Sequence, residues 1–262
     1  MGIPYIEKFD IDFGLAGKTA IITGAANGIG EAIANMYAKK AANIILADKS
    51  DSVHEAEKSC ASVAAGNARA ISIVGDITNR EFHSKIVDIA ASAFGGINIL
   101  VNCAGIALLD EAENLSEEYW DQTMDVNLKA AFMLSQVVGR YMMQHGGGKI
   151  INIASQASVI SLDRHVAYCA SKAGLVSVTQ VLAAEWAEYG INVNAISPTV
   201  VLTELGKKAW SGDVGEAMKK LIPANRFGYP DEIAACATYL ASDAANLITG
   251  ANIVIDGGFT IK

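Results

Sequence analysis

Seven short apolar runs recur along the chain: TAIIT (19–23), NIILA (43–47), AISIV (70–74), INILV (97–101), KIINIA (149–154), INVNAI (191–196) and NIVID (252–256). Their apolar positions are nearly continuous rather than alternating, which is typical of strands buried on both faces of a parallel sheet. The pattern therefore predicts a parallel sheet of about seven strands.

Alanine-rich stretches of helical character lie between the predicted strands, at residues 30–41, 52–65, 79–94, 115–145 and 165–189. Alternating strands and helices indicate βαβ units with right-handed crossovers, which place helices on both faces of the sheet. Because the chain shows no low-complexity linker and no break in composition, we expect one doubly wound α/β domain over residues 1–262.

The stretch 197–229 does not fit this rhythm, because it is rich in Gly, Pro and polar residues and is expected to be irregular. A long irregular segment within a compact domain usually serves the function. We expect a lid on the substrate side, and an ordinary surface excursion is the alternative.

Composition narrows the class of protein. Hydrophobic residues make up 52% of the chain, enough for a large core, and the net charge of −8 disfavours nucleic acid and anionic membrane as partners. The N-terminal residues do not resemble a secretory signal, and no apolar run approaches the ~20 residues that span a membrane. The cysteines show neither CxxC pairs nor metal-ligand spacing, so we expect a cytoplasmic protein with reduced thiols and no metal.

A glycine-rich segment, TGAANGIG (23–30), follows the first predicted strand and opens the first predicted helix. Gly24, Gly28 and Gly30 form a spacing variant of the dinucleotide-binding fingerprint. Glycines let the chain turn tightly against a pyrophosphate, while the helix N-terminus offers free N–H groups. The segment predicts a Rossmann-like dinucleotide site, with a purely structural turn as the alternative.

Asp48 ends the second predicted strand, where an acid is expected to bind the adenosine ribose hydroxyls and to repel a 2′-phosphate. The adjacent Lys49 argues for the phosphorylated cofactor, but the glycine loop holds no basic residue, so NAD is favoured. Asp76 and Asn102 end the third and fourth strands and are expected at the same sheet edge. For Asp76 the alternative is a place beside a helix cap.

These features, together with NCAG (102–105), NIAS (152–155), YCASK (168–172) and Pro198, resemble the short-chain dehydrogenase/reductase family from about residue 15 to the C-terminus. Cys103 and Thr199 depart from the family pattern, in which Asn and Gly are common at these places. HVAYCASK (165–172) and SPTVVLTELGKKAW (197–210) are similar to the branch of polyol and diol dehydrogenases that contains L-xylulose reductase.

The resemblance implies four catalytic residues. Tyr168 would act as general acid and base, and Lys172, four residues later on the same helix face, would favour its phenolate and hold the nicotinamide ribose. Ser155 would hydrogen-bond the substrate oxygen. Asn127 would bend its helix and hold a water that relays protons.

Further contacts follow from the same resemblance. Besides the residues already named, the cofactor would meet Asn27, Ile29, Ile77, Ala104, Gly105, Pro198, Val201 and Thr203. The substrate would meet Ser155, Tyr168, Gln156 and His165, with residues 199–210 closing above and Val200, Leu202, Leu205 and Trp210 as apolar walls.

The sequence therefore predicts an NAD-dependent oxidoreductase that interconverts a secondary alcohol of a small polyol or diol and the matching ketone or ketose. The resemblance also implies a homotetramer. A 3-oxoacyl-carrier-protein reductase is one alternative, although it would favour a basic surface and the phosphorylated cofactor. A non-catalytic NAD-binding redox sensor is another, although a sensor could dispense with Tyr168 or Lys172.

Overall fold

A computed structural model describes residues 12–203, 206, 210 and 212–262, and in this part of the chain seven strands form one parallel sheet. Their order across the sheet is β3-β2-β1-β4-β5-β6-β7. The bounds are β1 Thr19–Thr23, β2 Asn43–Asp48, β3 Ala70–Val74, β4 Ile99–Asn102, β5 Gly148–Ile153, β6 Ile191–Pro198 and β7 Asn252–Ile255. The predicted strands are confirmed, each to within two residues.

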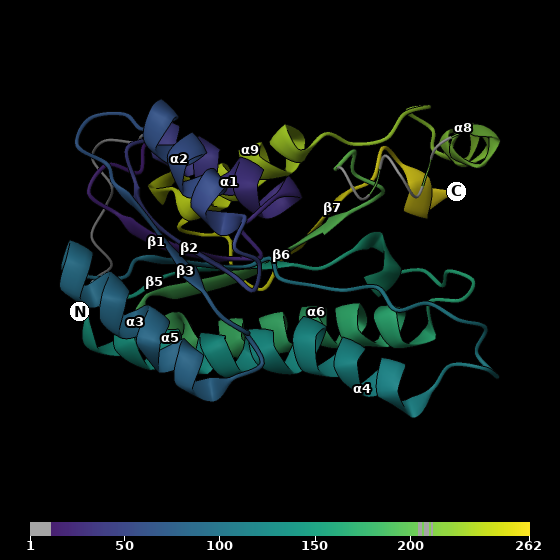
Figure 1. The fold of residues 1–262 in the computed structure, drawn as a ribbon, viewed down its shortest axis with the longest axis horizontal. Coiled ribbons are helices and arrows are strands. Elements are labelled where there is room, and N and C mark those ends of the chain that lie inside the picture. The colour runs from purple at the N-terminus through teal and green to yellow at the C-terminus, as the bar shows by residue number, and fades with distance from the viewer. Residues whose placement is uncertain (1–11, 204–205, 207–209, 211) are drawn as a thin grey trace.

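Helices cover both faces of the sheet, as predicted (Figure 1). One face carries α1 (Gly28–Lys39), α2 (Val53–Val63) and α9 (Pro230–Ala241). The other carries α3 (Arg80–Phe94), α4 (Glu117–Met124), α5 (Ala131–Gln144) and α6 (Val166–Trp186), with a π-helical turn, η1 (Asp125–Ala130), between α4 and α5. The short 3-10 turns are η2 Gln156–Ser158, η3 Ala187–Tyr189, η4 Asp243–Ala245 and η5 Phe259–Ile261.

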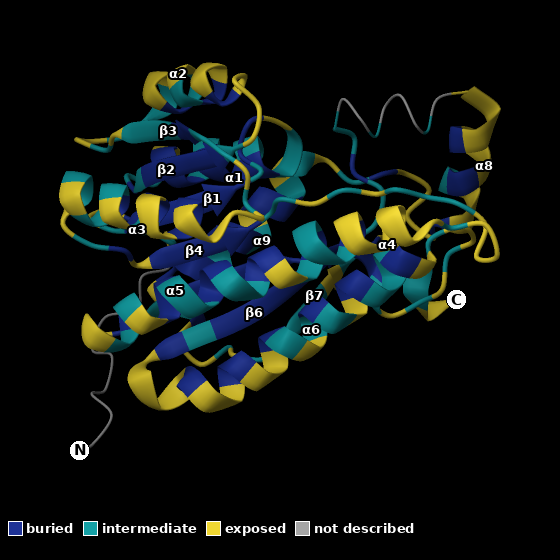
Figure 2. Ribbon diagram, turned by 60° about the horizontal axis from the view of Figure 1, so that its bottom comes forward, coloured by how far each residue is buried: buried dark blue, intermediate teal, exposed yellow. Residues whose placement is uncertain are grey.

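The continuous apolar runs are explained by two cores, one on each face of the sheet. Ile22 of β1 packs with Leu46 in the core under α1 and α9, while the next residue toward the N-terminus, Ile21, packs with Ile45 in the core under α3, α5 and α6. Successive side chains of a strand point to opposite faces, so burial of both faces removes the alternation. The inner strands β2, β1, β4, β5 and β6 are accordingly deeply buried, whereas the edge strands β3 and β7 are only partly buried (Figure 2).

The strand order reverses at β1, which pairs with β2 on one side and with β4 on the other. The loops that follow β1 and β4 therefore meet at the carboxyl edge of the sheet, where ligands bind in open α/β folds. The Thr23 hydroxyl joins them by accepting hydrogen bonds from the N–H groups of Cys103 (3.1 Å) and Ala104 (3.2 Å).

The segment 197–229 is more regular than predicted. It contains α8 (Gly212–Leu221), and Val201 forms a parallel bridge with Gly228. Three of the residues expected as pocket walls, Val200, Leu202 and Trp210, instead pack against a separate small core of Met218, Ile222 and Phe227. The fourth, Leu205, lies outside the described residues. The sequence of this helix, GDVGEAMKKL, does not indicate a helix clearly, because it is short and begins at a glycine.

Helix α6 continues through η3 to Tyr189, and an 18-residue window within these 24 residues has a mean hydropathy of 1.3, which meets the requirement for a membrane span by length and composition. Here the helix instead lies along the sheet against β6. Its polar side chains Ser171, Lys172 and Thr179 are buried and hydrogen-bonded within the fold. A core helix satisfies the same test, and this arrangement explains the apolar sequence.

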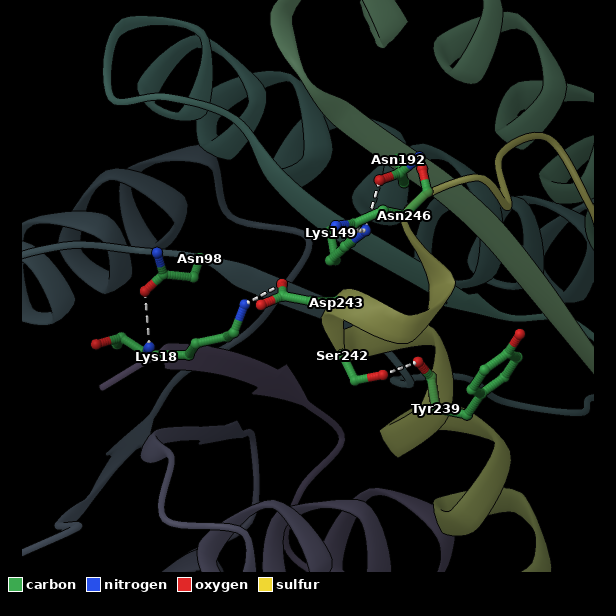
Figure 3. A network of polar contacts seen from close by, with 9 residues as sticks. Lys18, Asn98, Lys149, Asn192, Tyr239, Ser242, Asp243 and Asn246 are labelled. Atoms are coloured by element: carbon green, nitrogen blue, oxygen red, sulfur yellow. Dashed lines mark hydrogen bonds and ion pairs between the residues drawn. The ribbon is translucent and has the colours of Figure 1, made fainter. Parts of the chain in front are cut away.

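A polar network closes the opposite, amino-terminal edge of the sheet (Figure 3). Buried Lys149 of β5 donates from Nζ to Oδ1 of Asn192 in β6 and to Oδ1 of Asn246, both at 2.6 Å. Burial and the nearby charge of Lys18 together lower the pKa of Lys149 to about 8, although Asp243, which pairs with Lys18 at 2.7 Å, opposes the shift. The network ties β5, β6 and the turn after α9 together.

The depressed pKa of Lys149 makes folding stability depend on pH. Between pH 8 and the ordinary lysine value of 10.5 the unfolded chain binds more protons at this position, so stability rises with pH. We expect the free energy of unfolding of wild type to gain about 1–3 kcal/mol over Lys149→Met between pH 7.5 and 10 in urea titrations. A difference that stays constant over this range would contradict the assigned shift.

Candidate active site

The glycine loop is packed so tightly that side chains cannot replace its hydrogens. Gly24 and Gly28 have φ of +64° and +62°, in the left-handed region, and a Cβ on Gly24 would lie 2.8 Å from the Ala104 backbone. A Cβ on Gly30 would overlap the carbonyl oxygen of Gly24. Asn27, at the N-cap of α1, makes no side-chain capping bond, so the loop presents helix N–H groups of the kind that bind a pyrophosphate. The predicted contact residue Ile29 lies in the first turn of this helix.

Asp48 is held against the glycine loop from the end of β2. Its Oδ2 accepts from the N–H of Ala26 at 3.0 Å, and its Oδ1 accepts from the N–H of Ser50 at 2.9 Å. These bonds hold the carboxylate in place. Asp48 and its neighbour Lys49 both line a cleft at the carboxyl edge of the sheet.

A cleft of about 360 Å³ opens along the carboxyl edge of the sheet. It brings together many of the predicted cofactor contacts, namely Gly24, Asp48, Asp76, Ile77, Ala104 and Gly105. It also adds Thr23, Phe82 and Ile106, which were not predicted. Ser155 and Tyr168 are not among the residues that line this cleft, whereas Asp48, the residue expected to bind the adenosine ribose, is. The residues and the glycine cradle fit NAD.

Asp76 and Asn102 differ in what their side chains do. Asp76 lines the cleft, and its Oδ1 accepts from the N–H and the hydroxyl of Thr78, both at 2.8 Å; these bonds lower its pKa. The neighbouring cap is Asn79, which begins α3. The amide of Asn102 instead points into the interior, where Nδ2 donates to Ser135 Oγ and Asn152 Oδ1, so the predicted contact of this side chain with the cofactor stays a prediction.

Tyr168 and Lys172 lie together on α6, as the spacing predicted, with Lys172 Nζ 5.7 Å from the centre of the Tyr168 ring. Lys172 is only 4% exposed and donates to the carbonyl oxygen of Ile153, at the end of β5, at 2.8 Å. Burial lowers its pKa to about 8, and Cys103 acts in the opposite direction. The ammonium is thus fixed at the strand edge beside the phenol.

The pKa of Tyr168 is shifted in the direction opposite to our expectation. Burial raises it, and the hydrogen bond with Ser155 lowers it only in part. The expectation weighed the charges of Lys172 and of a bound nicotinamide ring and left out the cost of partly burying a phenolate, which is the largest effect on this ring. Ser155 itself caps η2 by accepting from the N–H of Ala157 at 3.2 Å, which holds its hydroxyl in place.

Asn127 lies within the π-helical turn η1, where the helix departs from regular geometry. Its Oδ1 accepts from the N–H of Ile106 at 2.8 Å, and its Nδ2 donates to the carbonyl of Ile106 at 2.9 Å and to Ser171 Oγ at 3.2 Å. The amide therefore holds the loop after β4 against the catalytic helix. The water relay expected for Asn127 stays a prediction.

The predicted substrate residues flank this cluster. Gln156 is buried directly after Ser155, and within the described part of the chain its Oε1 has no hydrogen-bond partner. The His165 ring stands edge-on to the Tyr168 ring, with centres 5.9 Å apart, and its Nδ1 lies 2.5 Å from the carbonyl oxygen of Asp163. Nδ1 therefore carries a proton, and in the neutral ring Nε2 is an acceptor.

The remaining predicted contacts follow β6. Pro198 ends the strand, and Val201 forms the bridge to Gly228. Thr203 lies against the glycine loop, since a Cβ on Gly28 would come within 2.9 Å of its methyl group. The sequence analysis did not predict Thr23 as a residue of the cleft. Its position at the end of β1, directly before Gly24, was the signal that could have identified it.

The comparisons with known proteins agree with this geometry. Residues 24–260 match a family model described as enoyl-(acyl carrier protein) reductase. Over 256 residues the chain is 58% identical to the NAD-dependent glycerol dehydrogenase of Listeria innocua serovar 6a, covering 98% of this chain and 99% of that protein. The chain belongs to the short-chain dehydrogenase/reductase family. As a member of this family it is an oxidoreductase that acts on CH–OH groups, which confirms the predicted enzyme class.

Two further short-chain dehydrogenases are similar over nearly their whole length. The D-threitol dehydrogenase of Mycolicibacterium smegmatis is 53% identical over 253 residues, which are 97% of this chain and 96% of that protein. The crystal structure of a putative short-chain alcohol dehydrogenase from Sinorhizobium meliloti 1021 superposes with a TM-score of 0.90 at 35% identity, covering 95% of this chain and 99% of that one. The predicted family and fold are thereby confirmed.

The position of Asp48 predicts a preference for NAD over NADP of about tenfold or more in kcat/KM, equivalent to about 1.4 kcal/mol. Asp48→Ala should narrow this preference, because the carboxylate that repels the 2′-phosphate is gone. Asp88→Ala, an equal charge change on the exposed side of α3, is the control. Equal use of both cofactors by wild type in steady-state assays would contradict the assignment.

Proposed function

We propose that this enzyme oxidises a secondary hydroxyl of a short polyol or vicinal diol with NAD, and reduces the matching ketose or hydroxyketone in reverse. The observation that carries the proposal is the position of Gln156 and His165, two side chains with free acceptor atoms, beside the Ser155–Tyr168–Lys172 cluster. A substrate with several hydroxyl groups supplies donors for both acceptors.

The cofactor is held by three parts of the chain. The glycine loop and the N-terminus of α1 receive the pyrophosphate, Asp48 binds the adenosine ribose, and Lys172 binds the nicotinamide ribose. When bound, NAD would supply the acceptor for the hydride that leaves the substrate carbon. The name of the relative from Listeria innocua, an NAD-dependent enzyme, supports this choice.

In the oxidation, Tyr168 removes the hydroxyl proton of the substrate while Ser155 holds the same oxygen by a hydrogen bond. The enclosed phenol has a raised pKa, so its deprotonated form depends on positive charge close by. Lys172 supplies that charge at 5.7 Å from the ring, and its own low pKa of about 8 makes it able to pass on a proton near neutral pH.

The substrate class follows from the acceptors near Tyr168. An aliphatic chain would leave Gln156 Oε1 buried without a partner, which is unfavourable in a closed site. The named substrates of the two relatives, glycerol and D-threitol, are both small polyols. We therefore assign this enzyme to substrates of about three to six carbons. The segment 197–229 is proposed as the lid over the substrate.

The alternatives are weaker. The description of the matching family model keeps an acyl-carrier-protein reductase in view, but the net charge of −8 would repel an acidic carrier, and Asp48 disfavours NADP. A redox sensor without catalysis has no need for the ordered pair of Tyr168 and Lys172. We place the enzyme in the cytoplasm as a soluble protein.

Tyr168→Phe should lower kcat for polyol oxidation by about 10²–10⁴-fold, because the proton acceptor is removed. NADH binding should persist, since the phenol does not hold the cofactor. Tyr189→Phe, at the exposed end of the same helix, is the control. Turnover close to wild type in steady-state assays of Tyr168→Phe would refute the role of general base.

Gln156→Ala and His165→Ala should each raise KM for polyols by about tenfold, the equivalent of one lost hydrogen bond of 1–1.5 kcal/mol. The same variants should alter KM for a simple secondary alcohol by less than about twofold. Efficient turnover of steroids or long 3-oxoacyl thioesters by wild type, with no activity on any polyol or diol, would overturn the proposed substrate class.

We also propose a homotetramer. Apolar side chains stay exposed on α6 and beyond, including Val181, Leu247 (98% exposed) and Ile261 (87%), and β7 is an edge strand with Val254 exposed. Such surfaces are usually covered by other subunits. Light scattering at micromolar concentration should give about four times the 27.4 kDa chain mass; a stable monomer would contradict the proposal.

A further inference from the structure

A buried hydroxyl lies between the two catalytic residues of α6. Ser171 has no solvent exposure, and its Oγ donates to the carbonyl oxygen of Tyr168 at 2.8 Å. The same Oγ accepts from Asn127 Nδ2 at 3.2 Å. Since a serine hydroxyl has a single proton, the direction of both bonds is fixed.

The remaining two hydrogen bonds of the Asn127 amide are both to Ile106. The N–H and the carbonyl of Ile106 pair with Asn127 Oδ1 and Nδ2 at 2.8 and 2.9 Å. Both amide protons of Asn127 are thus used, one by Ile106 and one by Ser171. Only one orientation of this amide satisfies all three bonds.

The loop that Asn127 holds belongs to the cofactor cleft, which Gly105 and Ile106 line. A Cβ on Gly105 would lie 3.3 Å from Asn127 Oδ1 and 3.5 Å from Lys172 Nζ. The loop after β4, the π turn and the catalytic lysine therefore converge at one point, and a displacement of any of them changes the shape of the cleft.

We propose that Ser171 is a positioning residue, which sets the catalytic helix in register with the cofactor-cleft loop through Asn127. The inference deepens the proposed function and rests on it for the effect on turnover, whereas the effect on NADH binding is independent of the substrate. Without the hydroxyl, a buried N–H of Asn127 loses its partner, and relief of that cost requires the π turn and the loop to move.

Helix α6 contains a matched control. Thr179 is equally buried; its Oγ1 donates to the carbonyl of Leu175 at 2.8 Å and accepts from Asn152 Nδ2 at 2.8 Å. Its bonding is the same as that of Ser171, but it lies two turns away from Lys172 and touches neither the loop nor the cleft. Ser171→Ala and Thr179→Val each remove a hydroxyl with little change of shape, so their cost to stability should be similar.

The test compares these variants by fluorescence titration with NADH and by steady-state oxidation of the best polyol substrate of wild type. Ser171→Ala should raise the Kd of NADH by about threefold or more and lower kcat by about tenfold, as expected for one lost buried hydrogen bond. Thr179→Val should stay within about twofold of wild type in both. Ser171→Thr, which keeps the hydroxyl, should recover NADH binding and guards against misfolding of the alanine variant.

Wild-type affinity for NADH in folded Ser171→Ala, or an equal loss in Thr179→Val, would overturn the positioning role. A wild type that binds NADH but oxidises no polyol would refute the proposed substrate instead, and the NADH titration would still decide the role of Ser171.

Discussion

The structure depends on one constraint: a sheet covered on both faces must find internal partners for most of the polar groups it encloses. Buried asparagine amides meet this need by donating to helix hydroxyls, in the pairs Asn102–Ser135, Asn127–Ser171 and Asn152–Thr179. Each hydroxyl in turn donates to a main-chain carbonyl of its own helix. The pairs Asn102–Ser135 and Asn152–Thr179 fix α5 and α6 against the sheet, while Asn127–Ser171 joins the π turn to α6 beside the reactive side chains.

The same enclosure governs the chemistry. Burial raises the pKa of Tyr168 and lowers that of Lys172, so desolvation opposes the charged form of both. The hydrogen bond between Ser155 and Tyr168, and the bond that Lys172 donates to the carbonyl oxygen of Ile153, orient the two side chains.

The sequence was sufficient for features that depend on local pattern. Continuous apolar runs marked the strands, and the spacing of glycines and of Tyr168 and Lys172 marked the site. Features that depend on packing could not be read this way. Helix α8 is short and stabilised by a small core assembled from distant residues, and the inward turn of the Asn102 amide is set by Ser135 and Asn152. The role of Ser171 requires the contact with Asn127, 44 residues earlier.

The π turn at Asp125–Ala130 has a consequence for how the chain can vary in length. A π turn holds one residue more than the α-helical path between the same flanking segments. Loss of a single residue there would leave a regular α-helix between the same flanking segments. The local widening of the helix that places the Asn127 amide against Ile106 would be lost. A change of length within this turn therefore disturbs the loop after β4 more than a substitution on its exposed face does.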